Sequence, residues 1–149
     1  YYEQALTLNF NYGDKQGDAT ILNNIGTAWM NLGEHRKALD YYEKALPLRR
    51  EIGDKWGEAT VLNNIGRMWS QMGDHRKAID YLKQSLPLRQ LVGDKRGEAV
   101  TWHNMAKVYE LLGDMPHALE AAEQAISTTY PHDHNMPFYN ETRTRLLGE

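Results

Sequence analysis

The chain has 149 residues, of which 41% are hydrophobic and 25% are charged, and these proportions are ordinary for a folded globular protein. A net charge of −3 argues against a general nucleic-acid-binding protein, which usually presents a basic face. The sequence has no cysteine, which excludes disulfides and thiolate metal sites, and no apolar run approaches the roughly 20 residues that span a bilayer. No signal peptide is visible, so the default expectation is a cytoplasmic protein with no membrane partner.

An internal repeat organises the chain. The phrase Gly-Asp-Lys-x-Gly-Asp/Glu-Ala begins at Gly13, Gly53 and Gly93, so both offsets are 40 residues. The phrase Leu-Asn-Asn-Ile-Gly at residues 22–26 recurs at 62–66 and, more loosely, at 102–106. A fixed period of this length indicates a stacked array of similar units.

The elements in chain order are pairs of helices. Residues 1–12 align with the end of the first full unit, so we expect them to form the second helix of a truncated repeat. Three units of 40 residues follow, at 13–52, 53–92 and 93–132, the last of them divergent at its end. Residues 133–149 are expected to be irregular, with a possible capping or next-repeat helix between 137 and 147.

Within the first unit, the sequence predicts one helix over about 15–32 and a second over about 35–52. Asp14 is a natural N-cap, because its carboxylate can accept hydrogen bonds from the free first-turn amides. Gly33 breaks the first helix, and Gly53 ends the second in a left-handed conformation. Pro47 and Pro87 fall inside the second helices, which we expect to be kinked but continuous because the apolar pattern runs on to the next glycine.

The helical spacing of large and small residues carries a family resemblance. Helix one reads Leu22-x2-Ile25-Gly26-x2-Trp29, and helix two reads Ala38-x3-Tyr42-x2-Ala45. This pattern resembles the tetratricopeptide repeat family, and the 40-residue period is similar to its long-repeat branch, seen in kinesin light chains, spindle-orientation scaffolds of the LGN/Pins type and bacterial regulators. The resemblance implies an all-α fold, a right-handed α-solenoid of antiparallel helix-turn-helix units. The period by itself leaves HEAT-type helical arrays open.

The resemblance also implies where a ligand binds. In this family the first helix of each pair lines the concave surface. The residues expected to bind a peptide there are Asn23, Asn24, Thr27, Asn31, Asn63, Asn64, Arg67, Gln71, His103, Asn104 and Lys107. Asn24, Asn64 and Asn104 form a column whose amides can each donate to and accept from a peptide backbone. The alternative is that these asparagines satisfy buried helix or loop groups.

Charge in the groove predicts a modest preference for acidic ligands. Arg67 and Lys107 share one column, and Glu110 partly cancels them. The carboxylate clamp known in the family needs cations at positions held here by Thr20, Thr60, Val100 and Asn104. Chaperone C-terminal tails are therefore not expected as ligands.

Catalytic and metal sites are weakly supported. The sequence has no phosphate loop, nucleophile elbow or HExxH pattern, so no enzyme activity, cofactor or metal is expected. His132-Asp133-His134 is a single short cluster in an irregular segment, and His35 and His75 are most simply turn residues. Trp29, Trp69 and Tyr109 have core spacing rather than the spacing of an RNA-stacking platform.

The functional hypothesis from sequence is a scaffold or adaptor module that binds an extended or helical peptide of a partner protein in its concave groove. A second hypothesis is a sensor or regulatory arm of a larger signalling protein, and self-association through uncapped repeat ends is a third.

Overall fold

The computed structural model describes residues 13–129 together with 141, 144–145 and 147–148. That part of the chain contains six α-helices and no strand, which confirms the all-α solenoid. The helices are α2 (Lys15–Asn31), α3 (His35–Glu51), α4 (Lys55–Gln71), α5 (His75–Leu91), α6 (Lys95–Leu111) and α7 (Met115–Thr128). The helices expected within 1–12 and 137–147 lie outside, or almost wholly outside, the described residues.

The caps that bound these helices are the predicted ones. Asp14 Oδ1 accepts a hydrogen bond from the Gly17 N–H at 3.0 Å, and Asp54 caps Gly57 in the same way at 2.8 Å. Gly33 and Gly53 have φ angles of +77° and +70°, a left-handed conformation in which a side chain would be strained. An aspartate cap starts every described helix except α3, where Glu34 makes no side-chain cap bond, and a left-handed glycine follows every one except α7.

Within the first two pairs the helices approach closely because a glycine faces a large side chain, whereas the third pair has Ala106 and Ala122 at these positions. A Cβ atom on Gly26 would lie 2.8 Å from the Tyr42 ring, and one on Gly66 would lie 2.9 Å from Leu82 Cγ. Tyr42 and Leu82 are fully buried. The small-against-large pattern read from the sequence is therefore the packing contact that closes α2 on α3 and α4 on α5.

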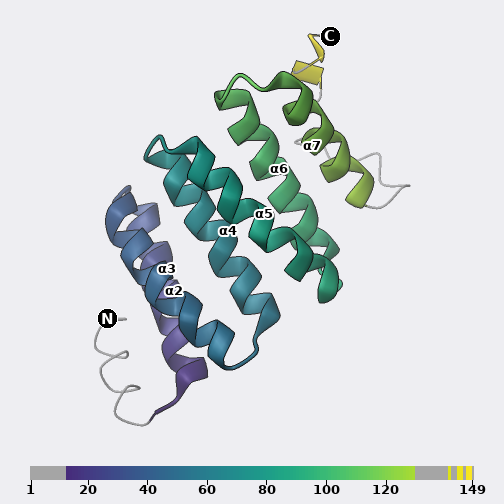
Figure 1. The fold of residues 1–149 in the computed structure, drawn as a ribbon. Helices are drawn as coiled ribbons and strands as arrows, with labels where there is room; N and C mark the ends of the chain where they lie inside the picture. Colours follow the sequence, from purple (N-terminus) through teal and green to yellow (C-terminus); the bar gives the residue numbers. More distant parts are fainter. Residues whose placement is uncertain (1–12, 130–140, 142–143, 146, 149) are drawn as a thin grey trace.

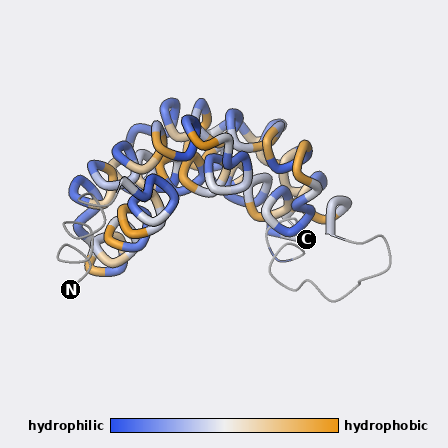
Figure 2. The backbone as a smooth tube through the Cα atoms, turned by 90° about the horizontal axis from the view of Figure 1, so that it is seen from below, coloured by the Kyte–Doolittle hydropathy of each residue, from blue (hydrophilic) through white to orange (hydrophobic). Residues whose placement is uncertain are grey.

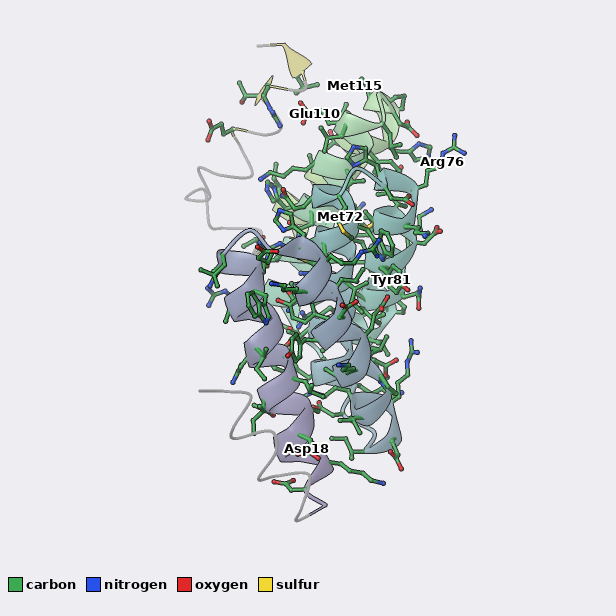
Figure 3. The ribbon with its side chains drawn as sticks, turned by 90° about the vertical axis from the view of Figure 1, so that its left-hand side faces the viewer. Asp18, Met72, Arg76, Tyr81, Glu110 and Met115 are labelled. Carbon is green, nitrogen blue, oxygen red and sulfur yellow. The ribbon has the colours of Figure 1, made fainter. Side chains whose placement is uncertain are left out.

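The pairs stack side by side into an arch (Figures 1 and 2). Where the preceding pair is described, a first helix packs on its own partner and also on the second helix of that preceding pair, as α4 does on α3 and α6 on α5. Asp18, near the start of α2, and Met72, just after α4, lie toward opposite edges of the array (Figure 3). The turns within pairs therefore occupy one edge, and the junctions between pairs occupy the other.

A buried arginine explains the most strongly repeated phrase of the sequence. Arg49, in the last turn of α3, is only 8% exposed, and its Nη1 lies 2.7 Å from Asp54 Oδ2. The arginine fits because Gly57 has no side chain: a Cβ atom there would lie 2.7 Å from Arg49 Cδ. Arg89, Asp94 and Gly97 repeat this arrangement between α5 and α6. We call each such group a junction arginine cluster.

The prolines do not interrupt their helices. Pro47 lies inside α3 and Pro87 inside α5, and both are exposed. Because the affected turn faces outward, solvent can satisfy the carbonyl that loses its helical partner. The prediction of continuous helices is confirmed.

Replacing Gly97 with alanine tests the junction arginine cluster. In an ordinary helix interior this change stabilises a protein by roughly 0.5–1 kcal/mol. Here the new methyl group would overlap the Asp94 carboxylate and lie 2.7 Å from Arg89 Nη1. We therefore expect a loss of about 1–3 kcal/mol in the free energy of unfolding, measured by urea denaturation. Arg96→Ala, at the exposed neighbouring position, is the control and should change stability by less than about 0.5 kcal/mol.

Candidate binding groove

The first helices of successive pairs are linked by amide hydrogen bonds. Asn64 Nδ2 on α4 donates to Asn23 Oδ1 on α2 at 3.4 Å, and Asn104 Nδ2 on α6 donates to Asn63 Oδ1 on α4 at 3.1 Å. Helices this close lie on the inner side of a curved stack, so α2, α4 and α6 are placed on the concave side of the arch whose curve Figure 2 shows.

Two hollows open between these helices. The first lies between α2 and α4 and is lined by Gln16, Thr20, Asn23, Asn24, Arg49, Asp54, Trp56, Gly57, Thr60 and Val61. The second, of about 310 Å³, lies between α4 and α6 and is lined by Arg67, Ser70, Gln71, Leu82, Val100, His103, Asn104, Lys107 and Val108. We call them the α2/α4 hollow and the α4/α6 hollow.

Most of the residues predicted from sequence fall in these two hollows. Asn23 and Asn24 line the first, and the second contains Arg67, Gln71, His103, Asn104 and Lys107. Thr27, Asn31, Asn63 and Asn64 line neither hollow. Of these four, Asn31 is exposed at the end of α2, and Thr27 directs its hydroxyl toward the Tyr42 hydroxyl at 3.1 Å.

Two predicted groove residues are largely covered. Asn63 is 7% exposed and His103 is 4% exposed, so they lie beneath the groove surface rather than on it. Both side chains are covered because the stacking of one pair on the next brings this side of the first helices against the neighbouring pair. Asn63 acts there as the acceptor for Asn104. The sequence analysis placed both side chains in the groove, open to a ligand, whereas the structure covers most of each side chain.

The asparagine column has both a structural role and unused hydrogen-bonding capacity. Asn64 and Asn104 each donate one N–H to the preceding helix, so each amide keeps its carbonyl oxygen and a second N–H. Asn24 is exposed, and among the described residues its side chain makes no hydrogen bond. The structural reading therefore holds for one N–H of Asn64 and of Asn104, and peptide binding by the remaining atoms stays a prediction.

The charge of the α4/α6 hollow is positive. Arg67 and Lys107 are both exposed and occupy the same register on adjacent helices. Glu110, which the sequence suggested would oppose them, is instead paired with Arg145 at 2.6 Å.

His103 lies at the floor of this positive region. Burial, and to a lesser degree the positive charges of Lys107 and Arg145, lower the pKa of its imidazole to about 4. At neutral pH His103 is therefore uncharged, and it adds no positive charge to the hollow.

Aromatic residues at the turn edge pack as the sequence predicted. Trp29, Trp69 and Tyr109 are partly buried against the core clusters. Lys37 Nζ lies 4.3 Å from the centroid of Trp29, and Lys77 Nζ lies 4.2 Å from that of Trp69. Because lysine side chains of the protein already lie over the Trp29 and Trp69 rings, little of their surface is left for a ligand.

Trp56 was not among the predicted site residues. It stands on the rim of the α2/α4 hollow and is 56% exposed. The sequence carried a signal that could have found it, because the equivalent positions in the other units hold Gln16 and Arg96.

Other classes of site find no support in the part of the chain that is described. It contains no cluster of three or more potential metal ligands, and the His132-Asp133-His134 segment lies outside it. None of its helices combines the length and apolarity required for crossing a bilayer.

Comparison with known proteins supports the repeat reading. A family model described as tetratricopeptide repeat matches residues 17–90 and 59–129. No curated protein is significantly similar to the chain in sequence.

Solved structures share the fold at low sequence identity. BtubC (BKLC) from P. vanneervenii has a TM-score of 0.84 at 20% identity; the match covers 99% of this chain but 64% of BtubC, so the chain spans less than two thirds of that protein. The TPR domain of Arabidopsis FLU has a TM-score of 0.72 at 22% identity, covering 76% of this chain and 95% of the domain. The TPR2AB domain of yeast Sti1, solved as a complex with pHSP90, has a TM-score of 0.73 at 17% identity. The match covers 87% of this chain and 46% of the Sti1 chain.

Acidification should destabilise the chain through His103. In the unfolded state its pKa is near 6.5, and in the folded state it is about 4. Between these values the unfolded state binds more protons, so the free energy of unfolding should fall as the pH drops from 6.5 to 4, by up to about 2–3 kcal/mol. His103→Asn, which copies Asn63 of the preceding unit, should flatten this part of the urea-denaturation pH profile. Replacement of the exposed His117 with asparagine is the control, and an unchanged profile in the His103 variant would contradict the assignment.

Proposed function

We propose that this chain, which belongs to the tetratricopeptide repeat family, binds an extended peptide segment of a partner protein across the concave faces of α2, α4 and α6. Members of this family are generally protein-interaction modules rather than enzymes. The 40-residue period further supports placing the chain in the long-repeat branch of the family.

The asparagine column is the observation that carries this proposal. Asn24, Asn64 and Asn104 stand one per repeat on the concave face, and each offers at least one donor and one acceptor that the described residues leave unused. Helix axes pack about 8–10 Å apart, and an extended chain advances about 3.3 Å per residue. Successive asparagines would therefore meet the ligand backbone about every third residue.

Backbone recognition by amides gives affinity with little sequence preference, and the cations add specificity. Arg67 and Lys107 flank the α4/α6 hollow, where an acidic side chain could approach both at once. Such charges also speed the encounter with an acidic partner. The complex of the yeast Sti1 domain with pHSP90 shows that a protein of this fold can bind another protein's segment. The cations of the carboxylate clamp known in the family have no equivalent here, where the positions hold Thr20, Thr60, Val100 and Asn104.

Replacing Asn24 with alanine should separate binding from folding. Peptides would first be selected from a random display library against the wild-type chain, and their affinities would be measured by fluorescence polarisation. Asn24→Ala should weaken the selected peptides by about 10-fold while leaving the melting temperature unchanged, because this amide holds no other part of the described structure. Asn64→Ala and Asn104→Ala should weaken binding and also cost about 1 kcal/mol of stability each, since each breaks a link between helices. If the selected peptides bind the variant with all three asparagines replaced by alanine as tightly as they bind the wild-type chain, the groove is not the binding site.

Charge reversal tests the acidic preference. Arg67→Glu and Lys107→Glu should each weaken acidic selected peptides at least 10-fold at low salt and reduce the salt dependence of binding. Lys83→Glu makes the same charge change on exposed α5, outside both hollows, and is the matched control. Equal losses in the control and the groove variants would mean that only net charge matters.

A further inference from the structure

The turn between α6 and α7 is more apolar than the turns within the other two pairs. Leu111 is 62% exposed, Leu112 is 40% exposed and Met115 is 44% exposed. The first two units carry polar residues at the positions of Leu111 and Met115, namely Asn31, Gln71, His35 and His75. The fold therefore does not require large apolar residues at these two positions, and a group of exposed apolar side chains indicates an interaction site. We call Leu111, Leu112 and Met115 the third-turn patch.

Cations gather at the same edge of the array. Arg36 and Lys37 lie in the first turn of α3, Arg76 and Lys77 lie in the first turn of α5, and all four side chains are exposed. Neither α3 nor α5 has an acidic residue in its first turn, whereas α2, α4 and α6 each have one. The helix dipole disfavours cations at a helix N-terminus, so helix stability does not account for these four residues.

The edge as a whole carries positive charge. We define the turn edge as residues 31–37, 71–77 and 111–117, in which four cations outnumber three carboxylates. Two of these carboxylates, Asp74 and Asp114, accept hydrogen bonds from first-turn amides as helix caps. Because the whole chain has a net charge of −3, the turn edge differs in sign from the rest of the molecule.

Apolar and cationic groups lie next to each other on the turn edge. A shallow hollow between the second and third turns is lined by Met72, Gly73, Asp74, His75, Arg76 and Leu112. Within the described part of the chain, no ion pair or ring contact holds the Arg76 guanidinium. Figure 3 shows Met72, Arg76 and Met115 together at the end of the molecule away from Asp18. Arg76 can therefore meet an anion that lies beside the apolar side chains.

The three turns form a row of protruding tips. Figure 1 shows the turns that follow α2, α4 and α6 side by side along one edge. The first tip also exposes an apolar side chain, because Leu32 is 72% exposed. Apolar side chains that enter the boundary of the acyl chains, with cations at the level of anionic headgroups, are the arrangement by which proteins bind a membrane surface. A deformable lipid surface can also close around protruding side chains.

We propose that the turn edge binds the surface of an anionic membrane, with the third-turn patch in the interface and the cations of α3 and α5 on the lipid headgroups. Long arginine and lysine side chains can reach the headgroups while the apolar tips lie deeper. This contact needs no membrane-spanning helix. It uses the ends of the helices, so the concave sides of α2, α4 and α6 stay open to a peptide, and the inference is independent of the proposed groove.

Vesicle sedimentation tests the proposal with the 149-residue chain. Vesicles of phosphatidylcholine alone are compared with vesicles in which one third of the lipid is phosphatidylserine. The chain should bind the anionic vesicles at least about 10-fold more tightly than the neutral ones, and high salt should weaken that binding.

A double variant with Leu111→Gln and Met115→His restores the residues of the second unit, Gln71 and His75. It should weaken binding to the anionic vesicles about 10-fold and leave the melting temperature unchanged, because the repeat already accepts these residues. Leu91→Gln is the matched control, since Leu91 is 71% exposed on the opposite edge, and it should bind as the wild-type chain does.

Charge reversal tests the cationic part of the edge. Arg76→Glu should weaken binding to anionic vesicles about 10-fold and leave the weak binding to neutral vesicles unchanged. Lys83→Glu makes the same change in charge on α5, outside the turn edge, and should have little effect.

A single dye locates the inserted side chain. The chain has no cysteine, so Met115→Cys can be labelled with one environment-sensitive fluorophore. Its emission should rise and shift to the blue when anionic vesicles are added, while the same dye at Leu91→Cys should not respond.

Three results would overturn the inference: no preference for anionic vesicles, full binding by the double variant, or equal losses in Arg76→Glu and Lys83→Glu. Sedimentation velocity covers the other occupant of the patch. If the wild-type chain forms a dimer that the double variant cannot form, and neither binds vesicles, the third-turn patch is an interface between copies and the membrane inference fails.

Discussion

The close approach of two helices at a glycine is the constraint on which the rest of the structure depends. Gly26 lies against the Tyr42 ring and Gly66 against Leu82, at separations that leave no room for a methyl group. This contact sets the distance between the helices of the first two pairs, and in the third pair two small residues, Ala106 and Ala122, face each other at the same positions. Alike pairs stack with the same offset each time, so the array curves, and its inner side becomes a groove.

The junctions between pairs hold that offset by a different chemistry. Arg49 and Arg89 are buried side chains, and an unpaired buried guanidinium would be strongly destabilising. Each is paired with an aspartate that also caps the following helix, at Asp54 and Asp94. One carboxylate thereby ends the turn, starts the helix and neutralises the cation, which ties the angle between successive pairs to a single local motif.

The groove draws its binding groups from residues that the stack also uses. The amides of Asn64 and Asn104 join neighbouring helices with one N–H and present their remaining atoms to the concave side. The structural role and the binding role that we propose therefore fall on different atoms of one side chain. If a peptide binds these amides as proposed, it would bridge the repeats, and its binding would stabilise the stack by linkage.

Local interactions account for what the sequence by itself determined. Helix limits within one residue, the aspartate caps and the left-handed glycines all depend on groups a few positions apart in the chain, so their spacing is sufficient to predict them. The 40-residue period then fixed the all-α stacked architecture. Which polar side chains reach the groove was decided only by the tertiary structure, because burial of Asn63 and His103 arises from contact between helices 40 residues apart. The exposure of Trp56 and the pairing of Glu110 with Arg145 likewise depend on how whole repeats meet, which no local pattern encodes.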